Sequence, residues 1–185
     1  MRVLLPICAG WALVASFEAI YFPPTWLETD SRIGALRLHL KLPGTSAGIE
    51  EPLVAVGKPG EATFAFIRLL PGAWARVGVE FWGRAAFESP DFKVAASDAE
   101  LTVEIAVPAL YPPPGDRRWR GVSETEQQRL LSQYRVAVNG VTQLHGKFEY
   151  SQAIRFPVYV GSNPLGGSAV SDRLTAIILT ARRQF

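Results

Sequence analysis

The chain has 185 residues, the length of a single domain of ordinary size. Hydrophobic residues make up 48% and charged residues 19%, so the chain can build a core and carries too little charge for a disordered protein. The net charge of +2 is not gathered into a basic stripe, which argues against a nucleic-acid-binding protein, and the single cysteine excludes an intrachain disulfide or a C-x-x-C zinc site.

The N-terminal segment is strongly apolar. Residues 3–22 contain no lysine or arginine, and Glu18 is their only acid. About twenty such residues cross the roughly 30 Å of bilayer hydrocarbon as a helix. Arg2 precedes the run, so the positive-inside tendency predicts a cytoplasmic N-terminus and an external remainder. We therefore predict an anchor or signal segment over residues 1–26 and a folded domain over 27–185.

Two other interpretations of this segment stay open. Val14, Ala15 and Ser16 offer the small residues of a signal-peptide cleavage site. Alternatively, the run is a buried strand and turn of the fold, an interpretation that Pro6 and Glu18 favour. The anchor and the cleaved signal both predict a domain outside the cytoplasm.

The rest of the chain predicts strands. Residues 36–42 alternate four leucines with three basic residues, which is typical of a half-buried antiparallel strand. Residues 63–70 are apolar at both parities, which predicts a central strand covered on both faces. Other strands are expected at 53–56, 74–82, 101–107, 134–138, 141–144, 158–160 and 173–182. Turn signals recur about every eight to twelve residues, so we predict an all-β, two-sheet antiparallel sandwich.

One helix and one hairpin interrupt this pattern. Ser123 and Glu126 form a Ser-x-x-Glu capping box, and Leu130, Leu131 and Tyr134 would then face inward. The pair at 139–140, Asn-Gly, predicts a two-residue type I′ hairpin turn.

Two stretches of the C-terminal half resemble a known family. Residues 134–140, Tyr-Arg-Val-Ala-Val-Asn-Gly, resemble a strand and turn of laminin-G-like domains, and residues 158–167 resemble a later strand and turn of that family. The arrangement is similar to the concanavalin A-like lectin/glucanase superfamily over residues 32–182. The resemblance implies a jelly roll that recognises carbohydrate, with calcium as the only cofactor it suggests. The Glu-x-Asp-x-x-Glu cluster of the superfamily's hydrolases is absent from this sequence.

The first candidate site joins an aromatic ring to carboxylates. Glu80 and Trp82 share the outward face of the strand at 74–82, and Glu104 points outward from the strand at 101–107. A ring that stacks on a sugar, beside an acid that accepts hydroxyl hydrogen bonds, makes a sugar site. Two acids within about 5 to 10 Å would instead suit a glycosidase. In the structural alternative, Trp82 packs under residues 84–92 and Glu80 is solvated or ion-paired.

The second candidate is a basic and aromatic patch made by Arg117, Trp119 and Arg120, which would meet an anionic glycan or lipid head groups. Its structural alternative is a loop whose tryptophan packs on the rim of the sandwich. His39 and His145 are the only histidines, and no metal site is predicted from them.

These observations predict a non-catalytic recognition module outside the cytoplasm, anchored in a membrane or exported, with carbohydrate or another envelope protein as its partner. A glycoside hydrolase and a structural or protein-interaction domain of the cell envelope are the alternatives.

Overall fold

The computed structural model describes residues 34–42, 48–94, 100–149 and 156–183. The predicted anchor at 3–22 and the domain boundary at residue 26 lie outside these ranges. Among the helices of the described ranges, none has the length and apolar character needed to cross a membrane.

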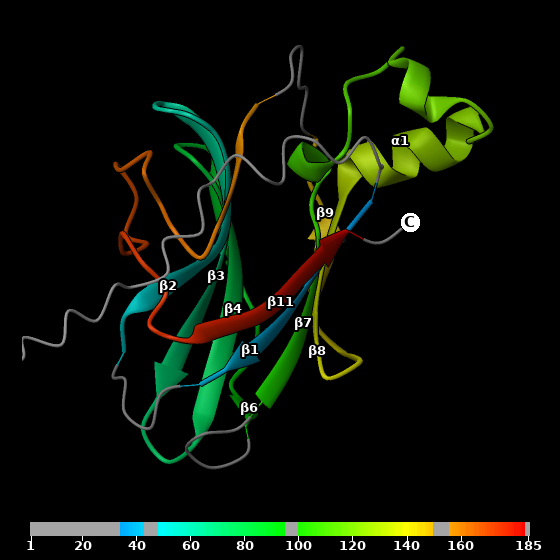
Figure 1. Cartoon of the computed structure of the whole chain (residues 1–185). Coiled ribbons are helices and arrows are strands. Elements are labelled where there is room, and N and C mark those ends of the chain that lie inside the picture. The colour runs from blue at the N-terminus through cyan, green and yellow to red at the C-terminus, as the bar shows by residue number, and fades with distance from the viewer. Residues whose placement is uncertain (1–33, 43–47, 95–99, 150–155, 184–185) are drawn as a thin grey trace, which may run out of the picture.

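The described residues form two antiparallel sheets that pack face to face (Figure 1). Sheet A has the order β11 (Ile177–Arg183), β1 (Leu36–Lys41), β7 (Glu100–Ala106), β8 (Gln133–Val138) and β9 (Val141–Lys147). Sheet B has the order β10 (Val158–Val160), β2 (Glu50–Lys58), β3 (Glu61–Leu70), β4 (Trp74–Phe81) and β5 (Ala85–Glu88), and β6 (Phe92–Lys93) also pairs with β4. The predicted two-sheet antiparallel sandwich is confirmed.

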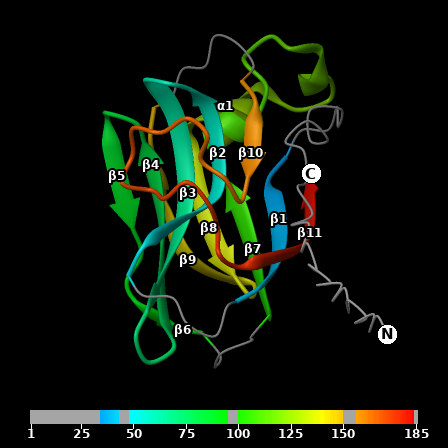
Figure 2. The same ribbon diagram turned by 60° about the vertical axis from the view of Figure 1, so that its left-hand side comes forward.

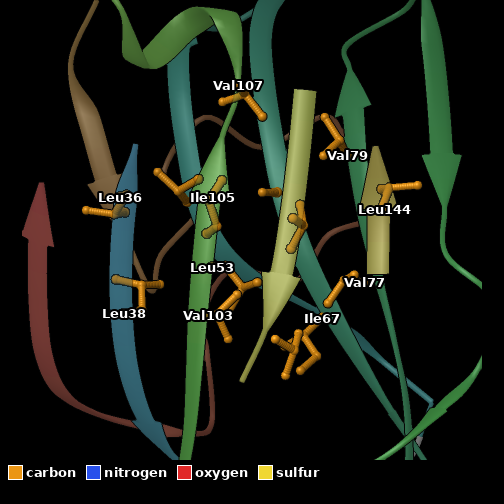
Figure 3. Close-up of a cluster of buried hydrophobic side chains, with 14 of the residues drawn as sticks. Leu36, Leu38, Leu53, Ile67, Val77, Val79, Val103, Ile105, Val107 and Leu144 are labelled. Atoms are coloured by element: carbon orange, nitrogen blue, oxygen red, sulfur yellow. The ribbon is translucent and has the colours of Figure 1, made fainter. Parts of the chain in front are cut away.

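The core lies between the sheets and follows the predicted alternation. Leucines at every second position of β1 point inward, and the basic residues between them point outward. Each large aliphatic side chain buried in this way contributes about 1.5–3 kcal/mol. Figure 3 shows the two inner faces meeting through Leu36, Leu38, Val77, Val79, Val103 and Ile105.

A second, smaller apolar cluster covers the opposite face of sheet B. Phe64 and Phe66 of β3 pack there with Val170, which belongs to the connection between β10 and β11. We call residues 161–176 of this connection the covering segment; Figure 2 shows its orange to red trace crossing in front of β2, β3 and β4. The covering segment explains why β3 is buried at both parities, as its sequence predicted.

Polar contacts hold the covering segment on the sheet. The buried carboxylate of Glu51 accepts hydrogen bonds from the backbone N–H (2.7 Å) and the hydroxyl (2.8 Å) of Thr175. The backbone N–H of Ser171 donates to the carbonyl of Glu50 at 2.8 Å. Because Glu51 is only 2% exposed, these bonds satisfy a carboxylate whose burial would be costly without them.

The connection between β7 and β8 contains the helical elements, η2 (Pro108–Leu110), η3 (Arg117–Trp119) and α1 (Glu124–Ser132), which lie at one end of sheet A (Figure 1). The Ser123 hydroxyl caps α1 by accepting from the N–H of Glu126 at 3.3 Å, as predicted. The Glu126 carboxylate, however, binds Arg129 at 2.5 Å.

The predicted inward face of α1 needs correction. None of its residues is buried, and Leu130 and Leu131 are half-buried. Tyr134 belongs to β8 instead, where it is buried. The reason is that α1 forms a wall of a cleft and does not enter the core between the sheets.

Candidate functional site

The first predicted pair, Glu80 and Trp82, lies on the outer face of sheet B. Glu80 accepts a hydrogen bond from the Ser168 hydroxyl at 2.6 Å. The Trp82 ring lies 5.8 Å from that of Phe64 and directly against Gly167, where no side chain would fit. Trp82 is therefore packed under part of the chain, as in the structural alternative, although it lies under the covering segment and not under residues 84–92.

Glu104 lies on the other side of the molecule. It points outward from β7 in sheet A, where it accepts hydrogen bonds from Arg37 (2.5 Å) and Arg135 (3.2 Å). These arginines lower the pKa of the Glu104 carboxyl, with the Arg37 hydrogen bond as the largest cause. Because the outer faces of the two sheets point in opposite directions, the structure does not bring Glu104 to Glu80 and Trp82.

The second predicted patch divides into a buried and an exposed part. Trp119 is buried; its ring stacks on Tyr111 at 6.2 Å, and its indole N–H donates to the carbonyl of Pro113 at 3.0 Å. Arg117 and Arg120 are exposed. The tryptophan thus supports the loop, while the arginines beside it remain accessible.

A cleft of about 1140 Å³ opens beside this loop, between the helical connection and the outer face of sheet A. We call it the basic cleft. Its acidic and basic lining residues are Arg118, Arg120, Glu126, Arg129, Arg135, His145 and Lys147. Arg120 is the one residue of the two predicted sites that lines it.

Strand register explains the floor of the basic cleft. Ala106 pairs with Arg135, and Arg135 pairs with His145, so the three form a row across β7, β8 and β9. Leu36 of β1 pairs with Ile105 of β7 in antiparallel register. Ala35, one residue before Leu36, therefore lies next to Ala106 and extends the row. All four line the cleft. Because the two alanines end at Cβ, the sheet surface is recessed beside the two larger side chains.

Three of the arginines have carboxylate partners. Arg118 binds Asp116 at 2.5 Å, and this contact lowers the pKa of the Asp116 carboxyl. Arg129 binds Glu126 at 2.5 Å and lowers its pKa in the same way. Arg135 shares Glu104 with Arg37, as described above.

The remaining basic groups of the cleft are not neutralised. Within the described ranges, the side chains of Arg120, His145 and Lys147 have no ion-pair or hydrogen-bond partner. All three are exposed. The basic cleft therefore carries a surplus of positive charge that water, salt or a ligand must balance.

The aromatic residues of the cleft do not offer free ring faces. Tyr111 is stacked on Trp119, and Tyr134 is stacked on Phe87 with a centroid distance of 5.0 Å. Burial raises the pKa of both tyrosine hydroxyls, so they stay protonated at neutral pH. A ligand in the cleft would thus meet charges and hydrogen-bonding groups and not an aromatic platform.

The sequence did not predict Arg129, Arg135, His145 and Lys147 as site residues. Two sequence features could have indicated this site: the strand residues among them occupy outward-facing positions, and a segment rich in arginine precedes them at 117–120. The residues described contain no group of three or more His, Cys, Asp or Glu side chains that could hold a metal ion.

No protein-family model matches the sequence, and no curated protein matches it. Among solved structures, it is similar to the Ruminococcus gnavus IT-sialidase CBM40, with 17% identity and a TM-score of 0.47 over 79% of this chain and 72% of that chain. For the same module bound to alpha2,3 sialyllactose, the identity is 18% and the TM-score 0.47, over 79% of this chain and 72% of that chain. For the module bound to alpha2,6 sialyllactose, the identity is 15% and the TM-score 0.44, over 79% of this chain and 73% of that chain. A likeness at this level assigns no function to this chain.

Proposed function

We propose that the protein is a non-catalytic recognition module that binds an anionic carbohydrate in the basic cleft. The observation that carries this proposal is the pair of exposed, unneutralised cations, Arg120 and Lys147, in a cleft large enough for several sugar residues. Its volume of about 1140 Å³ lies slightly above the roughly 300–1,000 Å³ typical of ligand pockets. An anion placed here would replace the missing carboxylate partners.

The shape and lining of the cleft favour a sugar over other anions. Gln133 and Thr142 add neutral donors and acceptors that suit hydroxyl groups. A flat lipid surface would not reach into a recess between α1 and the sheet. Single-stranded nucleic acid is held largely by base stacking, and the ring faces of Tyr111 and Tyr134 are already occupied.

The carboxylates near the cleft support binding over hydrolysis. A glycosidase needs an acid whose pKa is raised so that it can donate a proton near neutral pH. Glu104 and Glu126 have lowered pKa values because each is bound to arginine. Both would stay ionised and occupied by their partners.

Calorimetric titration with a matched pair of sugars tests this proposal. Alpha2,3 sialyllactose and lactose differ by one anionic sugar, and we expect only the anionic one to bind measurably. Replacing Arg120 and Lys147 by alanine together should weaken binding about fivefold or more, as expected for the loss of two charged contacts. Arg117→Ala removes a neighbouring exposed arginine outside the cleft and should leave affinity unchanged. Equal binding of lactose, or full affinity in the double variant, would contradict the proposal.

We also propose that residues 3–22 anchor the module in a membrane with the cleft outside the cytoplasm. The absence of lysine and arginine from this run supports the proposal. The full chain should sediment with membranes and need detergent for release, whereas a chain starting at residue 27 should remain in the supernatant and stay folded. An unfolded shorter chain would mean that residues 3–22 belong to the core.

A further inference from the structure

We infer that Arg135 and His145 together hold the anionic group of the ligand, and that binding tightens when His145 takes up a proton. This inference rests on the proposed function of the basic cleft and assigns the position and the pH response of its anion subsite.

The register places these two side chains side by side. Arg135 and His145 are directly paired on β8 and β9, which brings their Cβ atoms to about 4.5–5.5 Å. Both are exposed and both line the cleft. Ala106 and Ala35 continue the same row and leave a recess next to the guanidinium, so a sulfate or carboxylate has room beside Arg135.

The guanidinium of Arg135 is only partly used by the protein. Arg37 binds one oxygen of Glu104 through two nitrogens, at 3.1 and 2.5 Å, whereas Arg135 reaches the other oxygen through a single nitrogen at 3.2 Å. Among the described residues Glu104 is the acceptor of Arg135, so the remaining N–H groups of this side chain can donate to a ligand. Glu104 also holds Arg135 in position, so it acts as a positioning residue for the subsite.

Histidine is the side-chain type whose charge ordinarily changes between about pH 5 and 8, and His145 is the histidine that lines the cleft. The other charged groups that line the cleft come from the helical connection, β8 and β9: Arg118, Arg120, Glu126, Arg129, Arg135 and Lys147. Arginine and lysine side chains ordinarily carry their charge throughout this pH range. Glu126, and Glu104 behind Arg135, stay ionised because their pKa values are lowered. Protonation of His145 therefore adds a positive charge that nothing else in the cleft cancels.

The chain offers a matched control because it has two histidines. His39 points outward from the same sheet, pairs with Glu100 at 3.1 Å, and does not line the cleft. The test is the dissociation constant of lactose 3′-sulfate, whose sulfate stays ionised, at about pH 8 and pH 5.5 on either side of the histidine range. The full chain, His145→Gln, His39→Gln and Arg135→Ala are compared, each checked by its melting temperature.

We expect the full chain and His39→Gln to bind about three- to fivefold more tightly at the lower pH, the scale of one exposed charge pair. His145→Gln should keep the weaker affinity at both pH values, and Arg135→Ala should lose affinity at both. Binding that is independent of pH, or a pH response that persists in His145→Gln, overturns this inference and leaves the proposed function standing. Absence of binding at both pH values overturns both.

Discussion

Trp82 illustrates at the scale of one residue how neighbours far along the chain decide what a side chain does. The parity of β4 correctly predicted that it points away from the core, because Val77, Val79 and Phe81 take the inner positions. The sequence around it could not reveal that residues 161–176 return to cover this face. The ring is therefore part of the second apolar cluster, where it packs on Phe64.

Trp82→Ala should consequently lower stability. The ring is half-buried, so we expect a loss of about 2 kcal/mol, below the roughly 3–5 kcal/mol of a fully buried tryptophan. Urea denaturation would measure it. Trp74→Ala is the matched control, because Trp74 is 38% exposed with Lys93 over its ring, and it should cost less. Unchanged stability in Trp82→Ala, together with loss of sugar binding, would show that the covered face is the ligand site after all.

At the scale of an element, the β8–β9 hairpin shows that a two-residue sequence signal can predict the conformation of a turn. Asn139 and Gly140 have φ of 50° and 80°, as the predicted type I′ turn requires, and Val138 pairs with Val141 across it. The Asn139 side chain also accepts a hydrogen bond from the N–H of Thr102 at 2.9 Å, which ties the turn to β7. The turn sets the pairing of Ala137 with Thr142, and a register shift between Val136 and Ala137 then places His145 opposite Arg135.

Gly140→Val should cost about 1–3 kcal/mol, because a β-branched residue is strained at positive φ. A Cβ at this position would meet nothing within 4 Å, so the cost comes from the backbone and not from a clash. Gly140→Asn should cost less, since asparagine tolerates the left-handed region. Urea denaturation of both variants checks this, and equal losses would mean that the backbone conformation is not the cause.

Apart from the three-residue β10, which lies in a stretch that resembles a known family, the strands that the sequence predicted have alternation or an apolar run. The short strands β5 (Ala85–Glu88) and β6 (Phe92–Lys93) were missed, because two to four residues at the edge of a sheet give no periodicity to read. The basic cleft was missed for another reason. Its floor depends on which residues of β7, β8 and β9 lie opposite one another, and its wall depends on where α1 comes to rest.

At the scale of the whole molecule, charge is distributed unevenly over the two outer faces. Sheet B carries a network in which Arg68 and Arg76 bind Glu50, Glu88 and Asp91, so acids outnumber arginines. On the side of sheet A, the basic cleft has the opposite balance. The three carboxylates that pair with cleft arginines, Asp116, Glu104 and Glu126, are therefore what keeps the positive charges of this region together.

This balance predicts a specific sensitivity to acid. The pKa values of Asp116, Glu104 and Glu126 are lowered in the folded chain, mainly by hydrogen bonds from Arg118, Arg37 and Arg129 respectively. A lowered pKa means that the folded state holds its protons less tightly than the unfolded state does. The stabilisation is then fully present above the unfolded pKa values of about 4 and is lost as the pH falls through and below them. Protonation also leaves the arginines of the cleft to repel one another.

The melting temperature should accordingly fall steadily between about pH 5 and pH 3, the range in which the unfolded carboxylates take up protons. Glu104→Gln removes the carboxylate shared by Arg37 and Arg135, so this variant should start from a lower melting temperature at pH 7 and lose less of it on acidification. Glu149→Gln provides the control, because Glu149 is exposed and has no ion-pair partner within the described part of the chain. Circular dichroism melts at several pH values measure all three proteins. If Glu104→Gln and Glu149→Gln both follow the unmodified chain at every pH, the carboxylate at 104 is not what holds the positive charges beside the cleft together.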